Sequence, residues 1–434
     1  MKKVLIISYY WPPSAGAGVQ RWLKFSKYLR DFGWEPVVYT PENPESPHDD
    51  HSLLSDIPQG MLQLRRSIRE PYHLYKLFTG RSGKEKFQAG FLNERKKPGL
   101  ADQAATWVRG NFFIPDARKF WIRPSLNYLS AWLRDHPVDA MVSTGPPHSM
   151  HLIALKLKQR LGIPWLADFR DPWTRIDFYH KLRLTKWADR RHHYLENLVL
   201  TTADRVVTVS RHGASDLEEI GGREVEVVTN GFDPDDFRDI PPFDHEKFSL
   251  THLGSMNADR NPHALWEALS ELVREVPGFS DDLQIRLIGK TDIAVTEKLK
   301  TFELDRFVHN RQYLPHNQAL QEAANSAVLL LPLNRTPHAM GIATGKLYEY
   351  LALQRPILCI GPREGDAAAI IRETGSGTTA GFDEPGVVKE LLADWHSDFR
   401  QNRLDWQGSG TAPYSRVALT GKIAGILDGM TRNP

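Results

Sequence analysis

Short apolar runs alternate with amphipathic segments along the whole chain. The first run, Lys3–Tyr9, is strand-like, Gln20–Phe32 then has helical spacing, and Gly33 precedes a second strand-like run at Glu35–Thr40. Strands that alternate with helices in this way predict parallel βαβ units. Further strand-like runs lie at 139–143, 164–168, 204–210, 248–253, 283–288, 327–331 and 356–360.

A stretch rich in Pro and Asp, residues 233–244, divides these runs into two series. We therefore expect an α/β protein with two Rossmann-like, doubly wound domains that face each other across a cleft, because ligands of such sheets bind beyond the carboxyl ends of the strands. The first domain is predicted to span 1–240 and the second 241–411. The long, aromatic segment at about 41–135 is interpreted as a mostly helical insertion in the first domain.

Length and composition agree with two ordinary globular domains. The chain has 434 residues, 41% of them hydrophobic and 25% charged, and a net charge of +2, which disfavours disorder and general nucleic-acid binding. Its single cysteine, Cys359, excludes an internal disulfide and a cysteine-based zinc cluster. Val4–Trp11 runs into Pro12 and Pro13 without a signal-peptide cleavage site, and no apolar run approaches the roughly 18 residues that span a bilayer. We expect a cytoplasmic protein.

The segment from Leu64 to Pro124 is strongly basic. It holds 14 Lys and Arg against 5 Asp and Glu, with aromatic residues between them. This mixture suits a face that rests on an anionic membrane, or a mouth for a diphosphate-linked lipid acceptor. The alternative is a solvated face over a small aromatic core.

The loop after the first strand places glycines where a backbone must approach a ligand. Gly16 and Gly18 precede the predicted helix, and amides near Gly18 could contact a diphosphate or a sugar. A dinucleotide-binding loop would need glycine at Arg21 and an acidic residue after the second strand, so NAD binding is disfavoured. A simple tight turn is the alternative.

A second glycine-containing loop precedes a predicted helix at Thr344, Gly345 and Lys346. The amides of such a helix start, including that of Leu347, point toward anions, and Lys346 adds a full charge. Glu349 follows about one turn later, where it could accept hydrogen bonds from two ribose hydroxyls. A P-loop is excluded, because Met340 and Leu347 occupy its glycine and hydroxyl positions. The alternative is an amphipathic helix with a solvated Lys and Glu.

Two loops of the first domain carry the candidates for the acceptor side. Gly145 and His148 follow one strand, and Arg170 and Asp171 follow the next, so both loops should open at the same edge of the sheet. Asp171 is our first choice for the group that positions the acceptor hydroxyl or accepts its proton, with His148 second. A helix cap or a surface charge is the alternative for Asp171.

Two further segments are Asn230-Gly231-Phe232-Asp233 with Phe237, and the run at 346–357. In this order they resemble the interdomain signature and the "K-x-x-E-Y-L-A-x-G-x-P-I" block of family 4 glycosyltransferases of the GT-B fold, of the type found in bacterial polysaccharide and glycolipid biosynthesis. Asp171 lies in a segment similar to the "R-D-x-W" of one branch. The resemblance also implies that residues 412–434 form a helix that crosses back to the first domain.

The resemblance assigns further residues to a nucleotide diphosphate sugar. Gly254, Ser255 and Arg260 lie in a loop similar to the family's diphosphate loop, of whose two cations only Arg260 is present here. His316 lies in a Leu-Pro-His segment similar to one near the nucleobase. Gly341 stands where the family often has a glutamate near the donor sugar, which leaves the donor sugar open.

The resemblance implies sugar transfer to a hydroxyl acceptor, with retention of configuration and without a metal or other cofactor. Lys346 and Arg260 are expected to stabilise the leaving diphosphate, and Arg21, Gly145 and Arg170 to lie on the acceptor side. The acceptor implied is a lipid-linked or polysaccharide intermediate, with peripheral contact to the inner face of the membrane. A non-hydrolysing nucleotide-sugar epimerase and a non-catalytic sugar-nucleotide-binding subunit remain alternatives.

Overall fold

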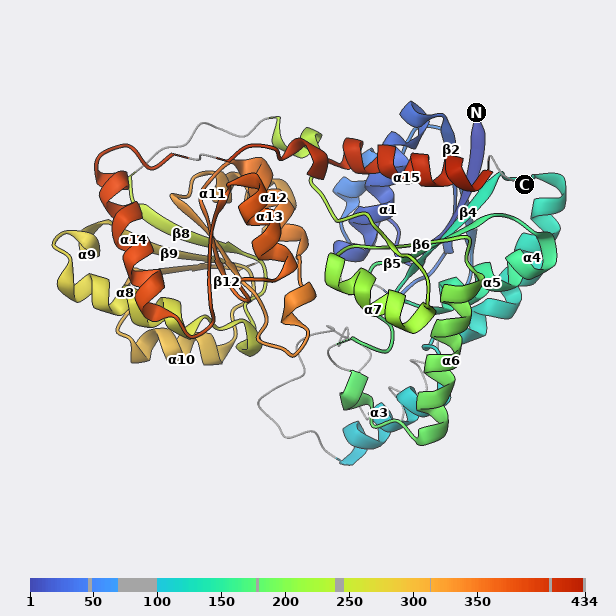
Figure 1. Cartoon of the computed structure of the whole chain (residues 1–434), viewed down its shortest axis with the longest axis horizontal. Coiled ribbons are helices and arrows are strands. Elements are labelled where there is room, and N and C mark those ends of the chain that lie inside the picture. The colour runs from blue at the N-terminus through green and yellow to red at the C-terminus, as the bar shows by residue number, and fades with distance from the viewer. Residues whose placement is uncertain are drawn as a thin grey trace. The chain divides into compact units, whose positions relative to one another are not determined.

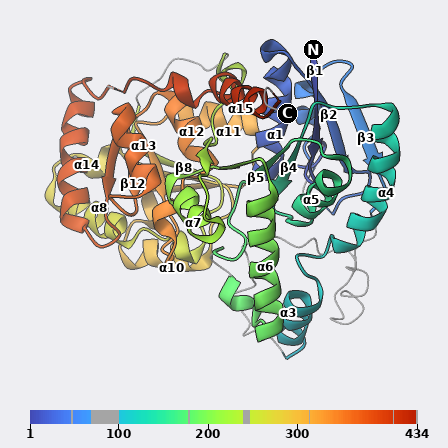
Figure 2. The same cartoon turned by 45° about the vertical axis from the view of Figure 1, so that its right-hand side comes forward.

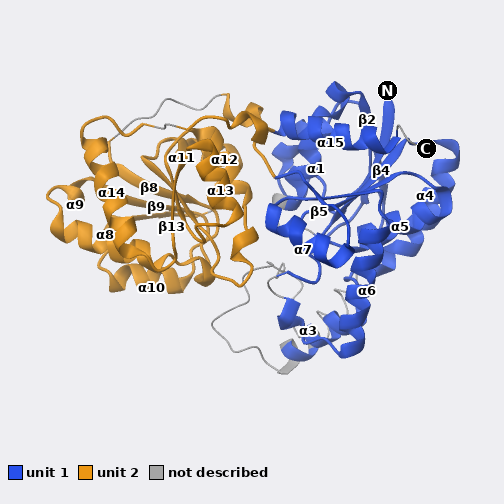
Figure 3. Cartoon of the chain, in the orientation of Figure 1, with its two compact units in different colours: residues 1–229, 416–434 blue, residues 230–415 orange. Residues whose placement is uncertain are grey.

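The computed structural model divides the chain into two compact units. Unit 1 comprises Met1–Thr229 with Arg416–Pro434, and unit 2 comprises Asn230–Ser415 (Figures 1 and 3). The structure describes residues 1–45, 49–68, 100–176, 179–238, 246–312, 314–405 and 408–431. The boundary between the two units therefore lies between Thr229 and Asn230, earlier in the chain than the expected boundary at 240–241. The last helix belongs to unit 1.

Unit 1 is built on a seven-stranded, fully parallel sheet in the order β3-β2-β1-β4-β5-β6-β7. In the central strand β1 the residue Ile6 pairs with Val38 of β2 and Val142 of β4. The strands are β1 Lys2–Ile7, β2 Trp34–Pro41, β3 Leu62–Arg66, β4 Ala140–Gly145, β5 Trp165–Phe169, β6 Arg205–Thr208 and β7 Glu226–Val227. The helices are α1 Ala17–Tyr28, α3 Leu100–Phe112, α4 Lys119–Asp135, α5 Ser149–Leu161, α6 Lys186–Thr202, α7 Arg211–Gly221 and α15 Arg416–Thr431.

Alternate residues of β1 fill the cores on the two faces of this sheet. Val4 and Ile6 pack with residues of α1 and α15, and Leu5 and Ile7 pack with residues of α4 and α5. These helices cover the two faces of the sheet (Figures 1 and 2). This alternation follows from the two-residue repeat of a strand. Because both faces are covered by helices, Val4–Ile7 of β1 form an unbroken apolar run rather than an alternating one.

Unit 2 repeats the design with a six-stranded parallel sheet in the order β10-β9-β8-β11-β12-β13. One core lies with α8 and α14, and the other with α11, α12 and α13. The strands are β8 Phe248–Leu253, β9 Leu283–Ile288, β10 Val308–Arg311, β11 Val328–Pro332, β12 Ile357–Ile360 and β13 Gly377–Ala380. The helices are α8 His263–Glu275, α9 Phe279–Asp282, α10 Ile293–Thr301, α11 His316–Ala324, α12 Gly345–Leu353, α13 Asp366–Thr374 and α14 Pro385–Arg400.

The prediction of an insertion at 41–135 is wrong for much of that segment. Residues 62–66 form β3, a strand of the sheet, and α4 covers that sheet on its way to β4. An edge strand with exposed polar residues has a weak hydrophobic pattern, and β3 was therefore not predicted from the sequence. The part of the basic segment at 69–99 lies outside the described residues.

Each sheet changes direction at one point in its strand order. In unit 1 this point lies between β1 and β4, and in unit 2 between β8 and β11. The loops that leave these strands diverge to opposite sides, which opens a crevice at the carboxyl edge where ligands of such sheets bind. The glycine-rich loops singled out in the sequence follow these four strands.

Candidate functional site

In unit 2, Lys346 lies directly against Gly254. A Cβ added to Gly254 would fall 2.5 Å from Lys346 Cε and 3.0 Å from its Nζ, and Gly254 has a φ of +88°. Both the close approach and the left-handed backbone therefore require glycine at the end of β8. Among the described residues no hydrogen bond or ion pair engages the Lys346 ammonium, so its charge is available to a ligand.

Arg260 is held beside Lys346 by its own loop. Its Nη1 donates to the Ser255 carbonyl at 2.9 Å and its Nε to Asn334 Oδ1 at 3.0 Å. Neither partner is charged, so neither neutralises the guanidinium. Asn334 follows β11 and was not predicted to take part. These bonds tie the loops after β8 and β11 together at the point where the sheet changes direction.

Burial in the first place, and uncompensated positive charge in the second, lower the pKa values around these cations. Burial, and then the charge of Arg260, lower the pKa of Lys346 to about 8, while Glu349 opposes the shift. Burial, followed by Lys346 and Arg260, lowers the pKa of the neighbouring His252 to about 3. His252 is thus neutral at physiological pH and adds no charge to the pair.

The helix α12 begins at this place with an uncapped N-terminus. Thr344 has the extended backbone of an N-cap residue, but its hydroxyl makes no capping hydrogen bond and is buried without a partner. The positive end of the helix dipole and the first amides are therefore not satisfied by a side chain. Gly345 is exposed and admits an approaching group. An anion at this helix start would find a hydroxyl, amides and two cations.

Leu347 does not fit its predicted role as a donor-binding amide. Its N–H already donates to the Thr344 carbonyl at 3.1 Å, and its side chain is fully buried in the core of unit 2. It therefore supports the helix start, as a core residue.

Glu349 and His316 form a pair one turn farther along α12. His316 Nε2 lies 3.0 Å from Glu349 Oε1, and both side chains are partly exposed. They come from α12 and the start of α11, two elements that pack in the same core. The sequence suggested separate contacts for them, with ribose and nucleobase, and did not predict that they touch each other.

In unit 1, Arg170 brings together the loops that follow β1, β4 and β5. A Cβ added to Gly18 would fall 2.5 Å from Arg170 Nη1, and Arg170 Nη2 donates to the Pro146 carbonyl and to Asp171 Oδ2, each at 3.3 Å. Gly16, with a φ of +110°, lets the chain turn into α1. Gly16, Gly18, Arg170 and Asp171 thus lie at one edge, as the order of the strands predicts.

Asp171 is the accessible carboxylate of this group. Its side chain is 46% exposed and pairs with Arg170, of which only 11% is exposed. The guanidinium anchors the carboxylate from the protein side and leaves its other face to a ligand.

His148 lies in a buried aromatic stack behind this edge. Its ring stacks on Trp173 with centroids 4.5 Å apart, and its Nδ1 is buried without a hydrogen-bond partner. A Cβ added to Gly145 would fall 3.0 Å from that Nδ1 and 2.5 Å from His151 Nε2, so glycine is required there too. Burial, and then His151, His192 and Arg170, lower the pKa of His148 well below its ordinary value, which keeps the ring neutral.

A neutral His148 is better suited to donate a hydrogen bond than to accept a proton. An N–H buried without an acceptor costs more than a buried lone pair, so the tautomer with the proton on Nε2 is favoured. In this tautomer Nε2 carries the ring proton and has no free lone pair, so Nε2 cannot act as a general base. Trp173, the tryptophan of the "R-D-x-W" segment, fixes the ring in this orientation.

Arg21 does not lie on the acceptor side as predicted. It is fully buried and donates through Nε and Nη2 to the carboxylate of Asp168, also fully buried, at 2.9 to 3.1 Å. Burial alone raises the pKa of Asp168, but Arg21, Trp22 and Thr144 outweigh it and lower that pKa. The pair fastens α1 to β5 and is structural. A polar residue that follows a glycine loop gives no sign in the sequence of whether it turns inward.

Asp233 has a local structural role. It is buried and accepts from the Asp235 N–H at 3.1 Å, which caps the short 3₁₀ helix Pro234–Phe237. Nowhere in the described ranges do three His, Cys, Asp or Glu side chains gather as a metal site would require.

Comparisons with known proteins agree with the sequence motifs. Residues 16–231 match the model of the glycosyl transferase 4-like domain family. HepE from Anabaena, solved with UDP and glucose, has a TM-score of 0.56 at 12% identity, over 100% of this chain and 98% of HepE. WaaG, a glycosyltransferase involved in lipopolysaccharide biosynthesis, has a TM-score of 0.57 at 14% identity, over 98% and 100%.

A third structure belongs to a different class of enzyme. A protein from Listeria monocytogenes described as a UDP-N-acetylglucosamine 2-epimerase has a TM-score of 0.58 at 12% identity, over 100% of this chain and 97% of that one. At such identities the likeness shows the fold, which is the predicted GT-B type with two Rossmann-like domains. A comparison with curated protein sequences finds no significant match.

Proposed function

The chain belongs to the glycosyltransferases that carry a glycosyl transferase 4-like domain, here over residues 16–231, and from this we propose that it moves a sugar from a nucleotide diphosphate sugar to a hydroxyl acceptor. One observation carries the proposal. Lys346, free of any ion pair among the described residues, packs on Gly254 beside Arg260 at the start of α12. A diphosphate supplies the negative charge that this arrangement lacks.

We propose that unit 2 binds the donor. The diphosphate would contact the Thr344 hydroxyl, the amides of Gly345 and Lys346, and the two cations, as anions do at helix N-termini. Glu349 would accept hydrogen bonds from the ribose, with His316 beside it toward the base. HepE, which was solved with UDP, makes a uridine nucleotide the first donor to test.

In the proposed reaction, the bond between the anomeric carbon and the β-phosphate oxygen breaks, and the acceptor oxygen bonds to that carbon. Both bonding electrons leave with the diphosphate, so negative charge grows beside Lys346 and Arg260. Preorganised cations and amides then stabilise the transition state more than the ground state. We further propose that no metal takes part and that configuration is retained.

We propose that unit 1 binds the acceptor. Asp171 would orient the acceptor hydroxyl or accept its proton, with Arg170 and the Gly18 amide beside it, and His148 would donate a hydrogen bond from Nε2. Gly145 would have an indirect role, because the absence of a side chain there leaves space for the rings of His148 and His151.

The test is the substitution Lys346→Ala. We expect turnover of a UDP-sugar to fall by about 100-fold, on the order of 3 kcal/mol of transition-state stabilisation, and UDP binding by calorimetry to weaken. Lys300→Ala, on the exposed side of α10, is the matched control and should change neither. Unchanged binding and turnover in Lys346→Ala would remove this lysine, and the donor site around it, from the proposal.

An epimerase is the second candidate, supported by the structure from Listeria. An epimerase converts the sugar nucleotide without a second substrate, whereas a transferase releases free nucleoside diphosphate and needs an acceptor for full turnover. Chromatography of the products with and without acceptor glycans distinguishes the two. An isomeric sugar nucleotide formed without acceptor would decide for the epimerase.

A further inference from the structure

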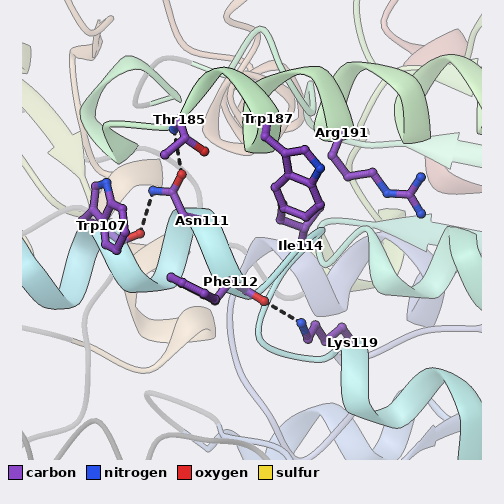
Figure 4. Close-up of a pocket in the computed structure, with 8 residues that line it drawn as sticks. All are labelled: Trp107, Asn111, Phe112, Ile114, Lys119, Thr185, Trp187 and Arg191. Carbon is purple, nitrogen blue, oxygen red and sulfur yellow. Dashed lines mark hydrogen bonds between the residues drawn. The ribbon is translucent and has the colours of Figure 1, made fainter.

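A pocket of about 390 Å³ opens on unit 1 where α3 meets the start of α6 (Figure 4). Trp107, Phe112, Ile114 and Trp187 supply its apolar wall. None of the described residues that line it belongs to the loops after β1, β4 and β5. The pocket is therefore separate from the candidate site on this unit.

Hydrogen bonds to the backbone hold this wall in place. Asn111 donates to the Trp107 carbonyl at 2.8 Å and accepts from the Thr185 N–H at 2.7 Å, which ties α3 to the start of α6. The rings of Trp107 and Phe112 meet edge to face, with their centroids 5.8 Å apart. The protein's own contacts therefore form the aromatic wall, which does not depend on a ligand.

Two rings of the wall are strongly exposed. The exposed fraction is 68% for Trp187 and 59% for Phe112, although burial of such side chains is normally favourable. In α6 the residues Ala188 and His192 are buried, whereas Trp187 and Arg191, each one position earlier, line the pocket. Exposed rings on a fixed, concave scaffold are typical of a ligand site.

The charge in the lining is positive and uncompensated. Lys119 and Arg191 are its charged members among the described residues, and neither forms an ion pair with any of them. Lys119 donates to the Phe112 carbonyl at 2.5 Å, and the Arg191 guanidinium lies over the ring of Tyr194, 5.2 Å from its centroid. A ligand that carries negative charge would supply what these two cations lack.

We infer that this pocket binds a saccharide that carries a carboxylate. One face of a pyranose ring is formed by C–H groups and packs flat on an aromatic side chain such as Trp187, while the hydroxyl groups at its rim meet polar atoms. The planar guanidinium of Arg191 matches a carboxylate through two parallel hydrogen bonds. An acidic sugar therefore satisfies the aromatic wall and the cations together.

Other ligands match only part of this lining. A hydrocarbon chain would cover the rings but leave both cations without a counter-charge, and a small inorganic anion would leave the rings exposed. A bilayer presents a flat surface, whereas these residues surround a pocket for a discrete molecule. Within the described ranges no helix is long and apolar enough to cross a bilayer.

The helix α6 connects the pocket to the acceptor side. His192, the neighbour of Arg191, accepts a hydrogen bond from Trp173 Nε1 at 3.0 Å, and Trp173 follows Asp171 by two residues. The pocket and the Asp171 loop thus lie on different sides of one helix, whose thickness is about 10 Å. A glycan of a few sugar units would reach from one to the other, which makes an acidic glycan the acceptor class. This last step rests on the proposed function, whereas saccharide binding itself does not.

The test measures binding of hexagalacturonate to the full chain by calorimetry, with its methyl ester as the neutral counterpart. We expect the acid to bind about tenfold more tightly than the ester, and less tightly as salt rises. Trp187→Ala should weaken binding of both compounds about tenfold, because both lose the aromatic platform. Lys119→Gln with Arg191→Gln should lower the affinity for the acid to that for the ester and leave the ester unchanged.

Two controls make the result specific. Lys156→Gln with Arg160→Gln, exposed on α5 of the same unit, makes the same change in charge and should bind the acid like the wild type. Lys346→Ala should keep its affinity for hexagalacturonate, and Trp187→Ala should keep its affinity for UDP. Failure of the saccharide site is therefore distinguishable from failure of the proposed function.

Four outcomes would overturn the saccharide site. They are equal affinities for the acid and the ester, an equal loss in the α5 control, competition between UDP and hexagalacturonate at a site lost in Trp187→Ala, and no binding of either saccharide. In the last case, binding of phosphatidylglycerol vesicles that is lost in Trp187→Ala would assign the pocket to a lipid instead.

Discussion

At the scale of single residues, two glycines have a steric role that was not predicted from the sequence. Gly254 and Gly18 are each so close to a cationic side chain, Lys346 and Arg170, that a methyl group would displace it. The sequence predicted that the backbone approaches a ligand at Gly18, and the family resemblance placed Gly254 in a diphosphate loop. The structure adds that each one leaves space for the cation that would meet that ligand.

Gly254→Ala should therefore act on the ligand through Lys346. We expect UDP affinity to fall by about tenfold, because the new Cβ displaces the ammonium, and stability to fall by about 1 kcal/mol from the left-handed backbone. Gly222→Ala is the matched control, since it has a φ of +61° and open space around it. Calorimetry on both variants separates the effects, and equal UDP affinities would contradict the steric explanation.

The lowered pKa of Lys346 makes donor binding depend on pH. A bound diphosphate favours the charged ammonium and raises its pKa above the value of about 8 in the free protein. Affinity should therefore be constant between about pH 7 and 8 and fall by up to tenfold per pH unit as the pH rises above 8. Lys346→Arg keeps its charge over this range and should flatten the profile of UDP affinity between pH 7 and 9.5. A decline of the same size in that variant would assign the titration to another group.

At the scale of elements, α1 depends on a buried ion pair with β5. Asp168→Asn would leave the fully buried Arg21 without its counter-charge, and removal of one partner from such a pair costs about 3–5 kcal/mol. Urea unfolding should show this loss, whereas Asp383→Asn, in an exposed pair with Arg335, should change little. A loss of similar size in both variants would argue against a special role for the buried pair.

The same pair fixes the sign of a pH effect on stability. The folded-state pKa of Asp168 is lowered, so the carboxylate stabilises the fold above its unfolded pKa of about 4. This contribution is lost as the pH falls through the folded-state pKa. Acid should therefore destabilise the wild type more than it destabilises Asp168→Asn.

The elements were predictable where the hydrophobic pattern is strong and unpredictable where it is weak. Central strands whose buried part is a continuous apolar run, such as Val4–Ile7 of β1 and Val328–Pro332 of β11, were predicted from the sequence. Edge strands were missed: β3 and β10 alternate or expose polar residues, and β7 has only two residues. Their position depends on pairing with a neighbour rather than on their own composition.

At the scale of the whole molecule, the fold class followed from the sequence, but the direction of side chains did not. The order of strands and loops placed Gly18, Gly145, Arg170 and Asp171 at one edge of the first sheet. Nothing in the sequence separates Arg21, which points into the core, from Arg170, which points to that edge. The contact between His316 and Glu349 also required the structure, because 33 residues separate the two in the chain.

The helix α15 has a consequence for the order in which the two units fold during synthesis. Its residues Leu419, Ile423 and Leu427 complete the core that contains Val4 and Trp22, and Lys2 pairs with Asp428. A nascent chain on the ribosome that has exposed only residues 1–229 thus carries an unfinished apolar surface until the last sixteen-residue helix emerges. Unit 2 can fold during that wait, so the second half of the molecule would be complete before the first.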